Sequence, residues 1–339
     1  MLRPSNIPGA CLSLAVLAGL LLAPAARAQA PAPNPAEAQK PGERPVDRDG
    51  VPTFSVETRL VVLHATVLDN NKHMVTDLQK EHFKVYDNDV EQQIRQFKRE
   101  DIPVSVGILV DNSGSMRDKR RKVNAAALTF VRTSNPADEV FIVNFNDEAF
   151  LDKDFTSNIE DLKDGLEKID SRGGTAYYDA IQMSIDHLKQ GARRSKKVLL
   201  VVTDGEDNAS RMNLEELVTL SHRSEVVIYT VGLLSEENRR AAKRAKRAME
   251  NISEATGGLA FFPDNADEVE GIAARIAHDI RNQYVLTFTP TNPGRQGDFH
   301  SLKVQAKAPG KGKLLVRTRT GYYTDRVAAG SSASNRGGE

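Results

Sequence analysis

Hydrophobic positions between residues 103 and 282 form continuous apolar runs that alternate with stretches carrying one apolar face. The continuous runs predict buried strands at residues 104–110, 140–145, 198–202 and 226–231. Helical spacing of apolar residues predicts helices at residues 122–132, 159–169, 177–190, 214–223 and 269–281. Strands that are apolar on both faces are typical of a parallel sheet covered by helices on both sides. We therefore expect an α/β fold with a doubly wound, mostly parallel, Rossmann-like sheet.

Shorter β-like segments lie on both sides of this region. Those before it, interpreted as three antiparallel strands, are residues 60–67, 83–86 and 94–97. Those after it are residues 284–288, 302–306 and 314–318. Because three strands alone make a thin domain, we predict that the two flanks pair into one small β-sandwich into which the α/β domain is inserted. The expected boundaries are 51–100 and 283–326 for the sandwich and 101–282 for the α/β domain.

Residues 1–28 have the pattern of a secretory signal peptide. Arg3 gives a basic start, residues 12–22 are almost entirely apolar, and Ala26-Arg27-Ala28 is a small-x-small cleavage site. The alternative is an uncleaved membrane anchor, but this apolar run is shorter than the roughly 20 residues that a spanning helix needs. No later apolar run is long enough to span a bilayer. We therefore expect cleavage after Ala28, no transmembrane segment after cleavage, and an exported protein that is periplasmic or secreted.

Two further segments lack apolar periodicity and are expected to be disordered. Residues 29–50 are rich in Pro and Ala and then charged, which is typical of an extended tether. Residues 327–339 are small and polar, which is typical of a disordered tail.

Composition excludes several classes of partner and site. Lys plus Arg and Asp plus Glu both number 46, so no overall field favours nucleic acid or an anionic surface. The single cysteine, Cys11, lies inside the predicted signal peptide, so a processed chain has neither disulfides nor thiolate metal sites. The 7 histidines show no paired metal-binding motif. A metal site would therefore have to be built from oxygen ligands.

Oxygen-bearing side chains gather in three loops at one predicted edge of the sheet. Asp111, Ser113 and Ser115 follow the first predicted strand, Thr175 precedes a helix, and Asp204 follows the third strand. The loops at the carboxyl ends of strands meet where the strand order of such a sheet reverses. Two carboxylates and three hydroxyls suit a hard, octahedral cation. These five residues are therefore candidate ligands for magnesium or manganese, with calcium as a third candidate.

Each of these residues also has an ordinary structural explanation. Asp111 and the two serines could form a helix N-cap with turn-forming side chains, Thr175 could cap the next helix, and Asp204 could be a turn residue before Gly205. Their combination in three loops is what favours metal binding.

The combination resembles the metal-ion-dependent adhesion site of von Willebrand factor A and integrin I domains, whose pattern is Asp-x-Ser-x-Ser with a distant Thr and a distant Asp. All five positions match, and the resemblance covers residues 103–282. It implies direct metal contacts from Ser113, Ser115 and Thr175, with Asp111 and Asp204 holding the ion directly or through water. In the flanks, three segments are similar to the acidobacterial-type VWFA-related family: Phe83-Lys84-Val85-Tyr86-Asp87, Tyr284-Val285-Leu286 and Arg319-Thr320-Gly321-Tyr322-Tyr323.

Three functions remain open at this point. The leading hypothesis is a non-enzymatic adhesion or scaffold module, in which the cation captures a carboxylate presented by a protein partner. The second is a structural envelope protein in which the sandwich binds and the metal only stabilises the loops. The third is a metal-dependent phosphohydrolase. Against it, the first loop has no second aspartate at Asn112 or Ser113, and no nearby His or Lys is evident as a proton shuttle.

A basic run at residues 239–247 carries six cations and invites a nucleic-acid interpretation. Apolar residues at helical spacing, however, predict a helix that packs on the sheet with its cations in solvent. These residues are Ala241, Ala245, Ala248, Met249 and Ile252. We therefore expect no nucleic-acid partner, and the sequence gives no indication of oligomeric state.

Overall fold

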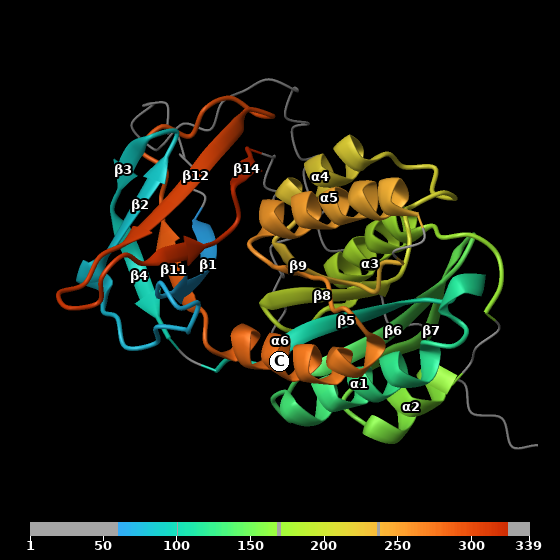
Figure 1. Ribbon diagram of the computed structural model, residues 1–339. Coiled ribbons are helices and arrows are strands. Elements are labelled where there is room, and N and C mark those ends of the chain that lie inside the picture. The colour runs from blue at the N-terminus through green and yellow to red at the C-terminus, as the bar shows by residue number, and fades with distance from the viewer. Residues whose placement is uncertain (1–59, 100, 168–170, 236–237, 325–339) are drawn as a thin grey trace, which may run out of the picture. The chain divides into compact units, whose positions relative to one another are not determined.

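The computed structural model describes residues 60–99, 101–167, 171–235 and 238–324 (Figure 1). The predicted signal peptide, tether and tail lie outside the described residues and stay predictions. Within the described ranges, no helix combines the length and the apolar character needed to cross a membrane.

A six-stranded sheet forms the centre of the α/β region. Its strands, in spatial order, are β10 (Ala260–Phe261), β9 (Val226–Gly232), β8 (Lys196–Thr203), β5 (Val104–Asp111), β6 (Glu139–Phe145) and β7 (Ala149–Thr156). All neighbours pair in parallel except β7, which is antiparallel to β6. The chain runs from β5 outward to β6 on one side and to β8 on the other, so the strand order reverses at β5. Loops at the carboxyl end of β5 therefore lie at the switch point where ligands bind in doubly wound sheets.

Helices cover both faces of this sheet (Figure 1). One face carries α1 (Arg120–Thr133), α2 (Ile159–Glu167) and α6 (Val269–Arg281). The other carries α3 (Tyr177–Gly191), α4 (Leu214–Arg223) and α5 (Arg239–Thr256). Neighbouring residues of one strand join opposite cores, since Ile108 packs under α1 and α6 while Leu109 packs under α3. This two-sided burial produces the continuous apolar runs, and the predicted doubly wound fold is confirmed.

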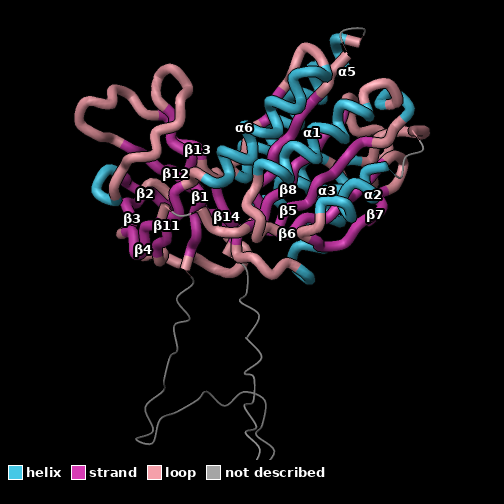
Figure 2. Tube along the Cα trace, turned by 90° about the horizontal axis from the view of Figure 1, so that it is seen from below, coloured by secondary structure: helices cyan, strands magenta, loops and turns pink. Residues whose placement is uncertain are grey.

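Two four-stranded antiparallel sheets are built from both flanks of the α/β region. One contains β13 (Leu315–Arg317), β1 (Val61–Leu68), β11 (Tyr284–Phe288) and β4 (Ile94–Lys98), and the other β14 (Gly321–Tyr323), β12 (Phe299–Ala306), β2 (Phe83–Asp87) and β3 (Val90–Gln92). Figure 2 shows β1 and β11, which are far apart in sequence, side by side. Side chains of both sheets, among them Leu63 and Val85, share one apolar core. The predicted sandwich made from the two flanks is confirmed, while its exact boundaries stay predictions.

The pairing of the flanks is more interleaved than the sequence indicated. The three strands expected before the α/β region, now β1, β2 and β4, do not pair with one another. Instead β1 and β4 both pair with β11, and β2 pairs with β12 and with the short β3. The β2–β3 hairpin turns through Asn88 and Asp89, both with positive φ, as the tight turn of a hairpin requires. Neither sheet can form from one flank alone.

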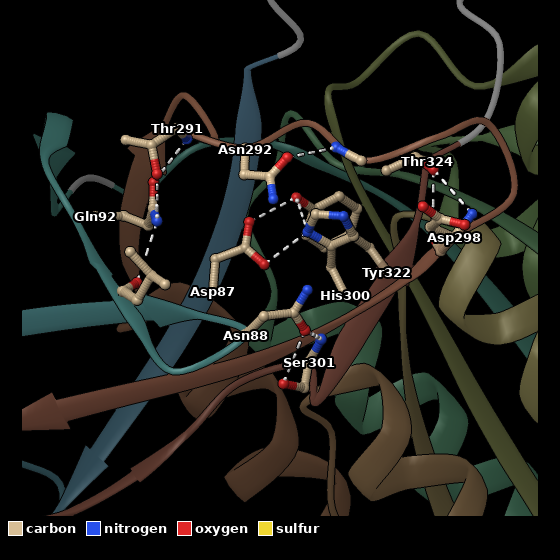
Figure 3. A network of polar contacts seen from close by, with 12 residues as sticks. Asp87, Asn88, Gln92, Thr291, Asn292, Asp298, His300, Ser301, Tyr322 and Thr324 are labelled. Carbon is tan, nitrogen blue, oxygen red and sulfur yellow. Dashed lines mark hydrogen bonds and ion pairs between the residues drawn. The ribbon is translucent and has the colours of Figure 1, made fainter.

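A buried polar group closes one end of the second sheet (Figure 3). His300 Nδ1 lies 2.8 Å from Asp87 Oδ1, and the Tyr322 hydroxyl donates to Asp87 Oδ2 at 2.9 Å. All three residues are buried. Asp87 and Tyr322 come from the two outer segments that resemble the VWFA-related family, so this contact gives those segments a shared structural role.

Asp279 of α6 links the sandwich strands to the α/β region. Its carboxylate accepts hydrogen bonds from Thr66 of β1 at 2.9 Å and from the Tyr229 hydroxyl of β9 at 2.8 Å. Arg317 of β13 donates to the same carboxylate at 2.5 Å, and both side chains of this ion pair are mostly buried. Three donors from three strands thus depend on one carboxylate.

We predict that Asp279→Ala lowers the free energy of unfolding by about 3 kcal/mol, because it leaves Arg317 as a buried charge without its counter-ion. The measurement is the urea midpoint of the purified chain followed by circular dichroism. Asp77→Ala is the matched control, because it removes the exposed carboxylate that pairs with Lys311. This control should leave the midpoint unchanged, and equal midpoints for both variants would contradict the linking role of Asp279.

Candidate metal centre

Asp111 is the last residue of β5, and its side chain is fully buried. Its Oδ1 accepts a hydrogen bond from the backbone N–H of Ser113 at 2.7 Å. Its Oδ2 accepts one from the Thr203 hydroxyl at 2.6 Å, and Thr203 ends the neighbouring strand β8. The carboxylate is thus held between the ends of two adjacent parallel strands. Sequence reasoning missed Thr203, although its position directly before Asp204 at a strand end was a usable signal.

Ser113, Ser115 and Asp204 have side-chain oxygens in direct contact. The two serine hydroxyls lie 3.2 Å apart, and Ser115 Oγ donates to Asp204 Oδ1 at 2.7 Å. In an octahedral magnesium site, with bonds of about 2.1 Å, neighbouring ligand oxygens lie about 3 Å apart. The observed spacing fits neighbouring ligands of such an ion. Asp204 is almost completely buried whereas Ser115 is exposed, so the group opens to solvent at Ser115.

Thr175 lies in the loop before α3 and is held beside the loop that follows β8. Its backbone N–H donates to Asn208 Oδ1 at 2.9 Å, and the Asn208 N–H donates back to its carbonyl at 3.0 Å. A methyl group on Gly205 would lie 3.8 Å from the Thr175 hydroxyl. Among the described residues, this hydroxyl makes no hydrogen bond to the other four predicted ligands. The structure therefore joins four of the five by hydrogen bonds and places the fifth next to Asp204's own loop.

The Thr175 loop depends on a contact that the sequence did not reveal. Asp147 Oδ1 accepts a hydrogen bond from the Gly174 N–H at 2.7 Å. Gly173 has a φ of +75°, and a side chain there would meet Asp147 Oδ2 at 2.0 Å. Only glycine fits at this position. The pair Gly173-Gly174 thus lets the loop pass close to Asp147 and bring Thr175 to the carboxyl edge of the sheet.

The loop after β8 also caps α3. Asp207 Oδ2 accepts a hydrogen bond from the Tyr178 N–H at 2.9 Å and from the Ser210 hydroxyl at 2.7 Å. A carboxylate is favourable at this position because a helix N-terminus carries partial positive charge. Glu206 instead forms a bidentate pair with Arg244 of α5, with distances of 2.5 and 2.8 Å. Neither carboxylate joins the group formed by Ser113, Ser115 and Asp204.

Two cations at the start of α1 lie near the two carboxylates, and Lys119 forms an ion pair with one of them. Lys119 Nζ donates to Asp204 Oδ2 at 2.5 Å and to the Leu233 carbonyl at 3.3 Å. Arg120 is buried and donates to Asn144 Oδ1 at 2.6 Å. Burial lowers the pKa of Arg120 to about 10, and the negative charge of Asp111 opposes this shift. The sequence was interpreted as having no lysine near the predicted ligands, and Lys119 corrects this, since it follows Ser115 by four residues and contacts Asp204. Arg120 was assigned no role from the sequence.

The donor set is poor in negative charge. Within the described ranges, no three His, Cys, Asp or Glu side chains are grouped so that they could hold a metal ion. Burial raises the pKa of Asp111 to about 6, and the hydrogen bonds from Thr203 and Ser113 oppose this rise. A cation at this position would therefore rely on hydroxyl oxygens and on two carboxylates that already have protein partners. This chemistry fits magnesium or manganese and does not fit zinc.

Comparison with known proteins gives a family match for the first part of the α/β region. Residues 106–206 match the family model of the von Willebrand factor type A domain. The chain contains a von Willebrand factor A domain.

A segment of inter-alpha-trypsin inhibitor heavy chain H4 from Sus scrofa is 27% identical over 122 residues, covering 33% of this chain and 13% of that protein. A segment of integrin alpha-11 from Mus musculus is 33% identical over 109 residues, covering 30% of this chain and 9% of that protein. The chain thus spans only a small part of the length of these relatives.

Solved structures are also similar to the chain. A von Willebrand factor type A protein from Catenulispora acidiphila is 11% identical with a TM-score of 0.45, covering 80% of this chain and 74% of that one. The protein BatB from Bacteroides thetaiotaomicron is 20% identical with a TM-score of 0.41, covering 52% of this chain and 98% of that one.

Asp111 makes the stability of the metal-free A domain depend on pH. Because its folded-state pKa lies above the ordinary value, its contribution to stability is complete below about pH 4 and is lost as the pH rises through about 6. A pKa that is higher by roughly two corresponds to about 3 kcal/mol in the free energy of unfolding. We predict that, in chelator, Asp111→Asn is more stable than wild type at pH 8, and that this advantage shrinks toward pH 4.

The measurement is the thermal midpoint of both proteins across this pH range in excess chelator. Asp267→Asn, which removes an exposed carboxylate paired with Lys122, is the control and should follow wild type at every pH. A difference between wild type and Asp111→Asn that stays constant with pH would contradict the raised pKa.

Proposed function

We propose that the chain is an exported, non-enzymatic binding protein whose A domain holds one divalent cation, which bridges to a carboxylate of a protein partner. The ligands are Asp111, Ser113, Ser115, Thr175 and Asp204. The observation that carries this proposal is the direct contact of the oxygens of Ser113, Ser115 and Asp204 at spacings of 3.2 and 2.7 Å. Export rests on the signal-peptide pattern of residues 1–28, and the site of action is the periplasm or the exterior.

The ligand set favours magnesium, with manganese as the next candidate. Calcium takes about six to eight oxygen ligands, often from bidentate carboxylates, whereas both carboxylate oxygens of Asp111 and of Asp204 already accept hydrogen bonds. A bound cation supplies positive charge and exchangeable coordination positions. Since Ser115 is exposed, a carboxylate from another protein can approach at this side of the group. The two carboxylates formally neutralise a divalent cation, but Lys119 and Arg120 already oppose their negative charge, so the occupied site can still attract a third carboxylate.

A binding role fits the comparisons better than catalysis does. The similarity to segments of integrin alpha-11 and of inter-alpha-trypsin inhibitor heavy chain H4 supports a binding module. Asn112, at the position where a phosphohydrolase of the kind considered would place a second aspartate, is tied to its own loop. Its backbone N–H donates to the Phe145 carbonyl, and its side-chain oxygen accepts from Ser171.

The proposal predicts that Ser115→Ala weakens magnesium binding at least about tenfold, because a ligand oxygen at the open side of the group is removed. Ser171→Ala is the matched control, since this hydroxyl lies next to the site and bonds to Asn112 but is outside the ligand set. Calorimetric titration with magnesium and with manganese measures both variants. The same immobilised proteins are then used to capture partners from an envelope extract of the source organism, with magnesium and with chelator.

A partner retained only with magnesium, by wild type and Ser171→Ala but not by Ser115→Ala, supports metal-bridged recognition. Magnesium binding that is equal in all three proteins would remove Ser115 from the site. Partners captured equally in chelator would move the binding surface away from the site. This last result would favour the second hypothesis, in which the sandwich binds and the metal only stabilises the loops.

Lys119 should lower the affinity of the site for a cation, because its ammonium group already occupies one oxygen of Asp204. We predict that Lys119→Met tightens magnesium binding about tenfold, since removing one positive charge at this distance is worth 1 kcal/mol or more. Lys122→Met removes a lysine of the same helix that pairs with exposed Asp267, and it should leave the affinity unchanged. Equal or weaker magnesium binding by Lys119→Met in calorimetric titration would show that Lys119 does not compete.

A further inference from the structure

The outward face of α5 is strongly basic. Six exposed cations occupy it: Arg239, Arg240, Lys243, Arg244, Lys246 and Arg247. The opposite face, with Ala245, Ala248, Met249 and Ile252, is buried against the rest of the A domain. Since the whole chain has a formal net charge of +0, this helix carries a local concentration of charge that the composition hides.

The cations lie on two different flanks of α5. At 100° per residue, Arg240, Arg244 and Arg247 point to one flank, which we call the site flank. Its direction is fixed by Arg244, which binds Glu206 in the loop after β8, two residues from Asp204. The other flank is fixed by Lys246, whose Nζ lies 4.9 Å from the centre of the Phe262 ring. Arg239 is on the same side as Lys246.

The site flank reaches the edge of the sheet that carries the candidate metal centre. Helix α5 follows β9, which is parallel to β8 and β5, so α5 begins at the edge where Asp111 and Asp204 lie. Arg240 precedes Arg244 by one helical turn and is therefore about 6 Å closer to this edge along the helix axis. Arg244 contacts the loop that carries Asp204, Arg240 lies beyond it on the side of the site, and Arg247 lies about 4.5 Å further from the edge along the axis.

Among the described residues, the two carboxylates that follow Asp204 in its loop are already engaged. Arg244 holds the pKa of Glu206 below its usual range through its hydrogen bond and its charge. Asp207 is turned toward the N-terminus of α3. In the described part of the chain, Arg240 and Arg247 form no ion pair, so both guanidinium groups are available to carboxylates from outside.

We propose that the partner is an acidic polypeptide segment, in which one carboxylate reaches the cation and neighbouring carboxylates pair with Arg240 and Arg247. This inference rests on the proposed function and names the partner class of the same site. Guanidinium groups bind carboxylates in bidentate fashion, and two of them on one helix flank match acidic side chains spaced along a peptide. The site flank therefore selects among the many carboxylates that could reach the cation.

The test uses two fluorescein-labelled twelve-residue peptides and the chain from residue 29 onward, in magnesium at low salt. One peptide has a single Asp among Gly and Ser, and the other has the same Asp flanked by Glu residues. Fluorescence anisotropy should show about tenfold tighter binding of the acidic peptide to wild type, as expected for two added charge-assisted pairs. In Arg240→Gln/Arg247→Gln this preference should fall to about twofold or less, while the affinity for the single-Asp peptide and for magnesium stays unchanged.

Arg239→Gln/Lys246→Gln is the matched control, because it removes two charges from the other flank of the same helix and should keep the preference. Thermal midpoints check that both double variants are folded. An equal loss of preference in both variants would show that the preference depends only on net charge. This result would overturn the proposed role of the site flank. No preference in wild type, or an unchanged preference in Arg240→Gln/Arg247→Gln, would overturn it as well.

Chelator separates this inference from the proposed function. If magnesium binds but neither peptide does, acidic-peptide recognition is wrong while the metal centre stands. If both peptides bind equally well in chelator, the metal-bridged function itself fails. A twenty-base single-stranded DNA and phosphatidylserine vesicles serve as competing probes. One of these probes could bind more tightly than the acidic peptide, in the presence of chelator as well, and lose this binding in Arg240→Gln/Arg247→Gln. Such a result would overturn the proposal and assign the site flank to another class of partner.

Discussion

The loops at the carboxyl edge of the A domain's sheet are arranged around one buried carboxylate at the end of β5. Asp111 loses its contact with water, and an ionised carboxylate in such a place is costly unless hydrogen bonds and positive charge offset the lost solvation. The Thr203 hydroxyl and the Ser113 N–H supply the hydrogen bonds, and Arg120 supplies charge nearby. The Thr203 hydroxyl reaches Asp111 because β5 and β8 are neighbouring parallel strands that end at the same edge, whereas the Ser113 N–H lies two residues along the same loop.

The loops around Asp111 are fixed by contacts that cross between them. Asp147 holds Gly174, Asn208 holds Thr175, and Asp207 caps α3. These bonds connect the loops after β6 and β8 to the segment before α3, so no single loop carries the group by itself. A site built on strand ends in this way is more rigid than one on a long free loop, which suits a group that must keep oxygen atoms at fixed spacing.

Sequence patterns were sufficient where burial on both faces left an unambiguous signal, as in β5 and β8. They also grouped Asp111, Ser113 and Ser115, because side chains at alternate positions after a strand converge, while Thr175 and Asp204 were added from their loop positions and from the resemblance. All five stay predicted ligands. The edge strand β7 was missed because its residues 152–154 are charged and none of its residues is fully buried, as is common for a strand that must avoid pairing with other chains. The interleaving of β1, β2 and β4 with the C-terminal strands was also out of reach, since pairing partners lie about 200 residues apart.

Interactions between distant side chains set a second limit to prediction from sequence. The pairs Lys119–Asp204 and Glu206–Arg244 join residues 85 and 38 positions apart, and neither spacing has a recognisable pattern. Both pairs decide the charge around the candidate centre. The basic run on α5 was correctly interpreted as a solvated helix face, because its apolar stripe is buried. The sequence alone does not show which side of α5 is turned toward the candidate metal centre. The contacts of Arg244 with Glu206 and of Lys246 with Phe262 show this.

The charge balance of the centre bears on whether a cation would serve binding or stability. Asp111 and Asp204 face Lys119 and Arg120, so the group contains two negative and two positive side chains before any metal is counted. A structural metal site, in contrast, usually holds its ligands apart until the ion neutralises them, and the fold then depends on the ion. Here the hydroxyls and carboxylates are hydrogen-bonded to one another, and their loops are fixed by Asp147, Asn208 and Asp207. A cation would have little left to stabilise in these loops, and its charge would be directed outward at Ser115, where a ligand can approach. A cation at this centre would therefore serve recognition better than loop stabilisation.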